Sequence, residues 1–335
     1  MFMQEDATVR KESIFSFSCG TSAVEQGEWY SHYKKQGYTF FENDFSSFDS
    51  TQSLGCQFAE KSVYDLFADK IFKNWDFKVA HSAKVRSIWE ECYGFQRKTV
   101  GYSRHYKYEC PATRKSGDPN TSLGNTIINC VSNYAAIKSF FEQTRGSAEV
   151  RIMAVGDDCL IAVKPSGKSS VQGVVQYVED YMKLLGLESK FKDSEETPTY
   201  CSHIFVEAQI KGMSTYVCVP EFTKRIQKLG FTVTPLRKGE SPASRMLASL
   251  NSLEATKFCP IYSHLHYAYT EVVARKRGDI HVTNINRFKP VSGERITLEP
   301  GSDWSIRYYG VSLGELERLG LKLASMIVQT EGKPF

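Results

Sequence analysis

Apolar and polar positions along the chain group into short runs, a pattern typical of a domain that mixes strands and helices. Two apolar runs, residues 152–155 and 160–163, flank the polar residues 156–158 and predict two strands joined by a tight turn. Residues 171–185 place apolar side chains at helical spacing, and Gly186 follows as a stop signal. We therefore expect a β-hairpin followed by a packed helix.

The same reading predicts elements elsewhere in the chain. Residues 40–43, which begin with two phenylalanines, predict a strand that runs into Asp44, and residues 200–220 alternate around Lys211-Gly212, which predicts a second hairpin. Ser312 and Glu315 have the spacing of a capping box ahead of an apolar stretch, so the last helix should begin there.

The turn at residues 156–158 carries two neighbouring carboxylates, Asp157 and Asp158. Carboxylate oxygens at the end of a stiff hairpin can bind hard cations. A Gly-Asp turn is also common for steric reasons alone, because Gly tolerates positive φ and Asp caps its own backbone. The turn indicates a cation site more strongly if further carboxylates lie beside it.

Asp44 and Asp49 are the upstream candidates. If Asp44 ends its strand beside the hairpin, it converges with Asp157, and several carboxylates can then hold two Mg²⁺ ions about 4 Å apart. Such a pair activates a 3′-hydroxyl and neutralises a leaving pyrophosphate. The alternative is that Asp44 caps a turn and Asp49 is solvated.

A third segment, which begins at residues 116–117, predicts a flexible loop that leads into a helix, with Asp118 as N-cap and Pro119 as the first helical residue. Thr121 and Asn125 are four residues apart, so a helix projects both from one face, towards whatever the loop at residues 116–117 contacts. Small hydrogen-bonding side chains of this kind suit a sugar.

These three segments resemble motifs A, B and C of the RNA-dependent RNA polymerases of positive-strand RNA viruses, and look closest to the tombusvirus-like and nodavirus-like groups. The family patterns are Asp, four residues and Asp; Ser-Gly, three residues, Thr, three residues and Asn; and Gly-Asp-Asp. Residues 44–49, 116–125 and 156–158 match them in order. The resemblance implies a right-hand fold, template and product RNA, ribonucleoside triphosphates, and two Mg²⁺ or Mn²⁺ ions.

The resemblance also implies residue roles. Asp44 and Asp157 would ligate both metal ions with help from Asp158. Lys190, or as second choice Lys192, would protonate the departing pyrophosphate. The nucleotide- and ribose-binding residues would be Asp49, Ser116, Gly117, Thr121 and Asn125. A reverse transcriptase is the weaker match, because that family usually places a bulky aromatic where Asp49 would act and Tyr before its aspartate pair.

The formal net charge of +4 does not by itself indicate a nucleic-acid partner. Between residues 93 and 115, however, basic side chains alternate with Tyr, Phe and His, a pattern suited to phosphate contacts and base stacking. A strand with one basic face is the alternative interpretation. The RNA-binding candidates are Arg97, Lys98, Arg104, Lys107, Arg114 and Lys115.

The motifs predict an α+β protein in four segments. We expect the palm to begin in residues 1–52, a fingers insertion at 53–110, the rest of the palm with motifs B, C, D and E at 111–222, and a mostly helical thumb at 223–335. About forty residues precede Asp44, without a basic motif F. We therefore expect an upstream replicase segment or a separate chain to supply the missing amino-terminal fingers.

Two functions are consistent with these motifs. The first is RNA-directed RNA synthesis as the catalytic part of a viral replicase, and the second is an inactive polymerase-like scaffold that binds RNA in a replication complex. No apolar run reaches the length of a transmembrane segment. We expect the chain in the host cytoplasm, in replication complexes attached to membranes through another polypeptide or region.

The cysteine and histidine residues give no strong indication of a metal site or of disulfide bonds. Nine cysteines without paired spacing fit a reducing compartment and core thiols. His264 and His266 are two residues apart, which predicts that both lie on one face of a strand. A packing role is favoured for them over a metal site, because no Cys or carboxylate at suitable spacing completes a ligand set.

Overall fold

The structure is a computed structural model of the chain. It describes residues 13–74, 84, 87, 98–111, 113–194, 198–210, 212–221, 224–225, 227, 235–236, 238–251, 259–275, 297–298 and 304–331. The chain divides into two compact units. The sheet unit comprises residues 10–19 and 37–195, and the hairpin unit comprises residues 1–9, 20–36 and 196–335.

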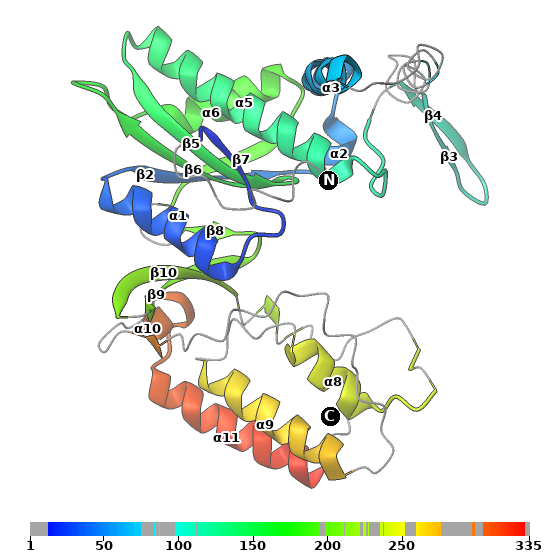
Figure 1. The fold of residues 1–335 in the computed structure, drawn as a ribbon, viewed down its shortest axis with the longest axis vertical. Coiled ribbons are helices and arrows are strands. Elements are labelled where there is room, and N and C mark those ends of the chain that lie inside the picture. The colour runs from blue at the N-terminus through cyan, green and yellow to red at the C-terminus, as the bar shows by residue number, and fades with distance from the viewer. Residues whose placement is uncertain are drawn as a thin grey trace. The chain divides into compact units, whose positions relative to one another are not determined.

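A five-stranded sheet forms the centre of the sheet unit (Figure 1). Its strands, in spatial order, are β1 (Phe15–Phe17), β5 (Ala148–Val155), β6 (Asp158–Pro165), β2 (Thr39–Phe45) and β7 (Ser189–Asp193). β1 runs parallel to β5, and the other neighbouring pairs are antiparallel. The β5–β6 turn lies at Gly156 and Asp157, where Gly156 has φ +65°, so the predicted hairpin is confirmed.

Helices α5 (Thr121–Gln143) and α6 (Val174–Leu184) pack together against this sheet (Figure 1). The buried core between them includes Phe41 and Phe191, whose rings stack with centroids 5.3 Å apart. Because side chains alternate along a strand, Glu42 and Asp44 of β2 point to the opposite face from Phe41. The apolar residues of β2 thus fix the direction of its carboxylates.

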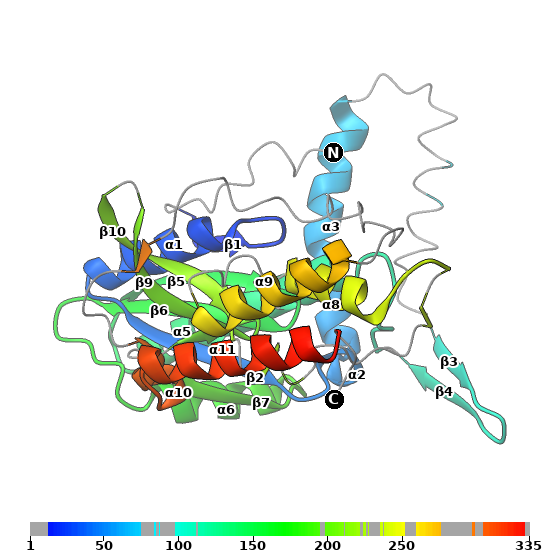
Figure 2. The ribbon, with the colours of Figure 1, turned by 90° about the horizontal axis from the view of Figure 1, so that it is seen from below.

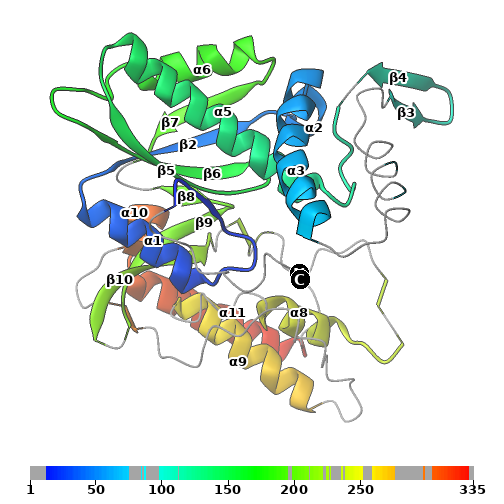
Figure 3. The same ribbon diagram turned by 45° about the horizontal axis from the view of Figure 1, so that its top comes forward.

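Between β2 and α5, the described residues include two helices and a small hairpin (Figure 3). These elements are α2 (Phe48–Thr51), α3 (Leu54–Asn74), β3 (Lys98–Tyr102) and β4 (Lys107–Pro111). α3 contacts α5, and β3 pairs with β4 in antiparallel register. This places α2 and α3 next to the beginning of α5, where the motif B loop also ends.

The hairpin unit is built around a long β-hairpin and several helices (Figure 2). Its strands are β8 (Thr199–Tyr200), β9 (His203–Ile210), β10 (Met213–Pro220) and β11 (Thr297–Leu298). Its helices are α1 (Ala23–Lys35), α8 (Pro242–Asn251), α9 (Pro260–Arg275), α10 (Trp304–Tyr309) and α11 (Leu313–Gln329). α9 and α11 lie side by side, and α11 begins with the predicted capping box of Ser312 and Glu315.

Both faces of the β9–β10 hairpin are covered. Val206 and Val217 are opposite each other and share a core with α8, α9 and α11, whereas Tyr30 of α1 packs on Phe205 and Tyr216 of the other face. α1 comes close enough that a Cβ on Gly27 would collide with the backbone of β10. The hairpin expected at residues 200–220 is therefore a central layer of this unit.

Several expectations need correction. His264 and His266 lie on helix α9, not on a strand; there they bond to Glu317 and Asn251, as packing residues do. The helix expected at 171–185 begins only at Val174, because Gly173 has φ +86°. The second hairpin packs with α1, α8, α9 and α11 inside one of the two compact units, and the division of the chain into four segments stays a prediction.

Helices long and apolar enough to cross a membrane are absent from the part of the chain that the structure describes.

Candidate active site

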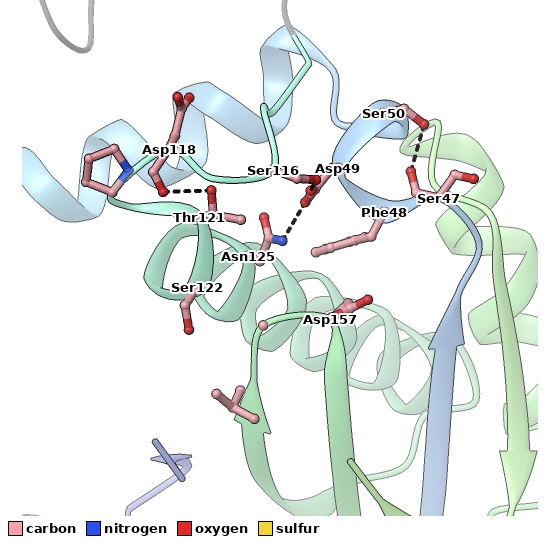
Figure 4. A pocket seen from close by; sticks show the side chains of 13 residues that line it. Ser47, Phe48, Asp49, Ser50, Ser116, Asp118, Thr121, Ser122, Asn125 and Asp157 are labelled. Atoms are coloured by element: carbon pink, nitrogen blue, oxygen red, sulfur yellow. Dashed lines mark hydrogen bonds between the residues drawn. The ribbon is translucent and has the colours of Figure 1, made fainter. Parts of the chain in front are cut away.

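An open cleft of about 800 Å³ lies where the β5–β6 turn meets α2 and the beginning of α5 (Figure 4). Its lining comes from residues 47–50, from six residues between 116 and 125, and from residues 155–157. Most of the lining side chains carry a hydroxyl, amide or carboxylate group. The three segments singled out in the sequence therefore meet at one cleft.

Two α5 side chains hold the turn that carries Asp157. The backbone N–H of Gly156 donates to the hydroxyl of Thr126 at 2.7 Å. The Asn129 amide donates to the carbonyls of Gly156 and Asp157 at 3.2 and 2.8 Å. Because Asn129 is completely buried, these hydrogen bonds have no competition from water, and they fix the backbone from which the Asp157 side chain projects.

The same helix connects the turn to β2. Asn133 donates to the Asn129 side chain at 2.8 Å and accepts a hydrogen bond from the Asn43 amide at 2.9 Å. All three asparagines are buried, and Asn43 directly precedes Asp44. One row of α5 side chains thus positions the backbone next to both Asp44 and Asp157.

Asp44 and Asp158 occupy adjacent strand ends. β2 and β6 pair with Asn43 opposite Cys159, so the next position on β2 is Asp44 and the next on β6 is Asp158. Both side chains are exposed, as is Asp157 in the turn. Asp157 lines the cleft, whereas Asp44 and Asp158 lie on the strands beside it and are not part of its lining.

The donor chemistry of this corner suits a hard divalent cation, because three carboxylates supply oxygen ligands only. Among the residues whose placement is described, however, no three His, Cys, Asp or Glu side chains lie close enough together to hold a metal ion. The three carboxylates are neighbours without forming a closed ligand set, so the two-metal site is a proposal.

The two lysine candidates lie on β7, the strand next to β2. Lys192 forms an ion pair with Glu42 at 2.9 Å, and the Glu42 side chain is only 9% exposed. Lys190 is opposite Asp44 in the register and is exposed. The geometry gives Lys192 a structural partner and leaves Lys190 as the candidate for proton transfer.

Asp49 receives hydrogen bonds on both carboxylate oxygens (Figure 4). Asn125 Nδ2 donates to Oδ1 at 2.7 Å, and the Ser116 hydroxyl donates to Oδ2. The backbone N–H of Arg114 also donates to the Asp49 carbonyl at 2.9 Å. The structure thus brings together three of the predicted ribose-binding residues from distant parts of the sequence.

The loop before α5 is closed by Thr121. Its hydroxyl donates to the carbonyls of Lys115 and Asp118 at 3.0 and 2.8 Å, although Thr121 also lines the cleft. The helix begins at Thr121, so the expected N-cap at Asp118 and first helical residue at Pro119 are wrong. Gly117 has φ +105° in this loop, a conformation that residues with a Cβ rarely adopt.

Arg114 was expected on the RNA-binding face, and the structure corrects this. Its side chain is only 4% exposed and forms an ion pair with Glu60 of α3, which is equally buried. A guanidinium in this position fastens the loop to α3 and does not reach a phosphate. Burial of a charge requires such a partner, which the sequence pattern did not reveal.

Two of the other basic candidates lie exposed on the β3–β4 hairpin. Lys107 and Arg104 are exposed on it, and Lys115 is exposed at the following loop. Tyr102 and Tyr106 are each 77% exposed, and the Lys107 ammonium lies 6.0 Å from the centre of the Tyr102 ring. The Lys98 side chain and Arg97 lie outside the described residues.

Two thiols lie beneath the site. Burial raises the pKa of Cys130 to about 12 and that of Cys159 well above its ordinary value. Both are therefore neutral packing groups near neutral pH, as the sequence predicted for core cysteines.

The family model for RNA-dependent RNA polymerase matches residues 7–241, and the chain belongs to this family. The resemblance inferred from motifs A, B and C is thereby confirmed. Nothing in the match distinguishes tombusvirus-like from nodavirus-like groups, so that narrower assignment stays a prediction. No curated protein matches the chain.

Solved structures agree on the fold. The crystal structure of the RNA-dependent RNA polymerase of a human picorbirnavirus aligns with a TM-score of 0.54 at 14% identity, over 79% of this chain and 47% of that polymerase. Its insertion loop deletion mutant aligns with a TM-score of 0.54 at 15% identity, over 81% and 48% of the two chains. The present chain thus spans about half the length of the polymerases it resembles.

Sequence reasoning did not identify the residues that position the site. Asn129 and Asn133 follow Asn125 on α5, and the spacing of residues 126, 129 and 133 is helical, which was a usable signal for one polar face. Gln52 and Glu60 gave no comparable signal, because their partners come from other segments of the chain.

Proposed function

We propose that this chain carries the nucleotidyl-transfer site of template-directed RNA synthesis from ribonucleoside triphosphates. The observation that carries the proposal is the bonding of Asp49 to Asn125 and Ser116 in a cleft that Asp157 also lines. A sugar-sensing carboxylate beside a candidate metal ligand is what selective transfer of a ribonucleotide requires. Membership of the polymerase family supports this assignment.

The sugar is selected by polar complementarity. The Asp49 carboxylate can accept a hydrogen bond from a ribose 2′-hydroxyl, and the Asn125 amide has two N–H groups, of which one can donate to the same hydroxyl. A deoxyribose offers neither interaction. A site built around such groups rejects the analogue, because its own polar atoms are left unmatched.

Asp44, Asp157 and Asp158 would hold two Mg²⁺ or Mn²⁺ ions, which when bound activate the attacking 3′-hydroxyl and neutralise the leaving pyrophosphate. The protein itself positions the carboxylates and supplies a proton. Thr126 and Asn129 fix the backbone of the turn, and the exposed ammonium of Lys190, opposite Asp44, supplies a proton to the departing group.

The β3–β4 hairpin supports contact with single-stranded RNA. Three exposed tyrosines, Tyr102, Tyr106 and Tyr108, offer ring faces on which bases can stack, and Arg104 and Lys107 provide charge for the phosphates. Stacking together with non-specific charge suits a template strand whose sequence varies.

The test of this function is the choice between ribo- and deoxyribonucleotides. The variants Asn125→Ala and Asp49→Ala should lower the ratio of ribonucleotide to deoxyribonucleotide incorporation about tenfold or more, the effect of losing one hydrogen bond to a charged group. Incorporation is measured with the chain and with any longer polypeptide that contains it. The ratio of the affinities for GTP and dGTP, measured by calorimetry, provides a second readout.

Ser50→Ala is the matched control, because Ser50 lines the same cleft but donates to the Ser47 carbonyl and not to Asp49. This variant should keep the wild-type ratio. Unchanged ratios in both Asn125→Ala and Asp49→Ala would contradict the sugar-sensing assignment.

A further inference from the structure

A continuous row of buried polar side chains connects Asp49 to helix α3. Arg114 Nε donates to Gln52 Oε1 at 3.0 Å, and Gln52 Nε2 donates to Asn125 Oδ1 at 2.8 Å. Asn125 in turn donates to Asp49 at 2.7 Å. At the far end, the Arg114 guanidinium forms its ion pair with Glu60.

The two ends of this row fix the direction of every hydrogen bond within it. A guanidinium can only donate, and a carboxylate can only accept. The Gln52 oxygen must therefore face Arg114, and its NH₂ group must face Asn125. It follows that the Asn125 oxygen faces Gln52 and its NH₂ group faces Asp49 and the cleft.

Burial makes this orientation stringent. Gln52 is 2% exposed and Asn125 is 5% exposed, so a flipped amide would leave buried polar atoms unpaired. The ion pair is also tightly enclosed. Asn120 donates to Glu60 at 2.9 Å, and a Cβ on Gly124 would lie 2.6 Å from an Arg114 nitrogen.

We propose that Gln52, Arg114 and Glu60 are positioning residues for sugar selection, which set the Asn125 amide so that its N–H groups face the ribose. The inference rests on the proposed function, since it assigns the orientation of a residue that senses the 2′-hydroxyl. It adds that selectivity depends on side chains that do not touch the nucleotide. A purely structural role for the ion pair predicts altered stability with unchanged selectivity.

The variant Gln52→Glu tests the orientation directly. The new carboxylate keeps the shape of the side chain and still accepts from Arg114, but it cannot donate to Asn125 Oδ1. The Asn125 NH₂ group is then drawn towards residue 52, and its oxygen turns towards Asp49. We expect the ratio of GTP to dGTP affinity, and the corresponding incorporation ratio, to fall about tenfold.

Gln57→Glu is the matched control, because the Gln57 amide contacts the Thr113 carbonyl at 3.4 Å and lies outside the row. Arg114→Lys is the second variant. Its ammonium keeps the charge beside Glu60 but lacks the fork that also reaches Gln52, so selectivity should fall here too. Thermal melting of each variant shows whether it is folded.

The outcomes separate the two claims. If Asn125→Ala lowers selectivity while folded Gln52→Glu and Arg114→Lys keep the wild-type ratio, the positioning role is wrong and the proposed function stands. If Asn125→Ala itself leaves the ratio unchanged, the sugar-sensing function fails. A fall in Gln52→Glu and Arg114→Lys, with Gln57→Glu unchanged, supports the proposal.

Discussion

Asp44 and Lys190 stand directly opposite each other across the antiparallel β2–β7 pair. Opposite residues of such a pair share one face of the sheet, so a candidate metal ligand and a candidate proton donor project side by side. Two positions along the same strands, Glu42 and Lys192 repeat the arrangement and form an ion pair at 2.9 Å. The register therefore distinguishes Lys192, which forms an ion pair with Glu42, from Lys190, which lies beside the candidate metal ligand Asp44.

The first prediction follows from this pairing. Lys190→Ala should slow nucleotide incorporation about 10²-fold, the usual contribution of a general acid, with little change in the free energy of unfolding. Lys192→Ala should do the opposite and destabilise the fold by about 1 kcal/mol, because its ion pair with Glu42 is lost. Single-turnover kinetics and denaturant unfolding measure the two effects. A larger kinetic loss in Lys192→Ala would reverse the assignment.

The second prediction concerns the turn that carries Asp157. Asn129→Leu removes the two side-chain hydrogen bonds to the turn carbonyls and should destabilise the protein by about 2–4 kcal/mol while also weakening Mn²⁺ binding. Ser139→Ala on the same helix is the control, since Ser139 bonds to Tyr177 away from the turn. Mn²⁺ affinity, measured by calorimetry, should be unchanged in the control. Equal affinities in both folded variants would exclude a role for Asn129 in placing the carboxylate.

The third prediction tests the enclosed ion pair. Gly124→Ala places a methyl group against Glu60 and Arg114, and should lower the free energy of unfolding by about 3–5 kcal/mol, as breaking a buried pair does. The helical Gly314, whose added Cβ meets open space, supplies the comparison. Gly314→Ala should be neutral or slightly stabilising because Ala favours helix. Similar unfolding midpoints for both variants would show that the pair is not tightly enclosed.

The fourth prediction concerns the exposed hairpin. Tyr106→Ala should weaken binding of single-stranded RNA by about 1–3 kcal/mol, whatever the sequence, because stacking on a ring tolerates every base. Lys107→Ala should instead reduce the dependence of affinity on salt, since a phosphate contact releases counterions. Fluorescence anisotropy at several salt concentrations measures both. RNA binding that is unaffected by either change would remove the hairpin from the RNA path.

Local patterns predicted the elements that depend on nearby residues. The Gly-Asp turn, the hairpin at residues 200–220 and the capping box of Ser312 each depend on residues within one turn or strand pair, and all three are present. His264 and His266 show the limit of such reasoning. Their two-residue spacing fits a strand, but packing of α9 against α11 makes the segment helical.

The parts that sequence did not predict depend on distant segments. Gln52, Arg114 and Glu60 meet only because α2, α3 and the motif B loop fold around the start of α5, and no spacing in the chain announces that meeting. Arg114 looked like one more basic residue in a basic segment. Its burial beside Glu60 is a tertiary property, and it changes the interpretation from RNA contact to support of the site.

The most direct test of the central claim is Mg²⁺-dependent ribonucleotide incorporation by the chain, or by a longer polypeptide that contains it, in the wild type and in Asp157→Asn and Asp44→Asn. An amide keeps the shape of the side chain but lacks the charge that a divalent ion requires. We expect both variants to remain folded, because Asp157 lies at an exposed turn and Asp44 at an exposed strand end, and to lose incorporation. Near-normal incorporation with Mg²⁺ in both variants would contradict the assignment of these carboxylates.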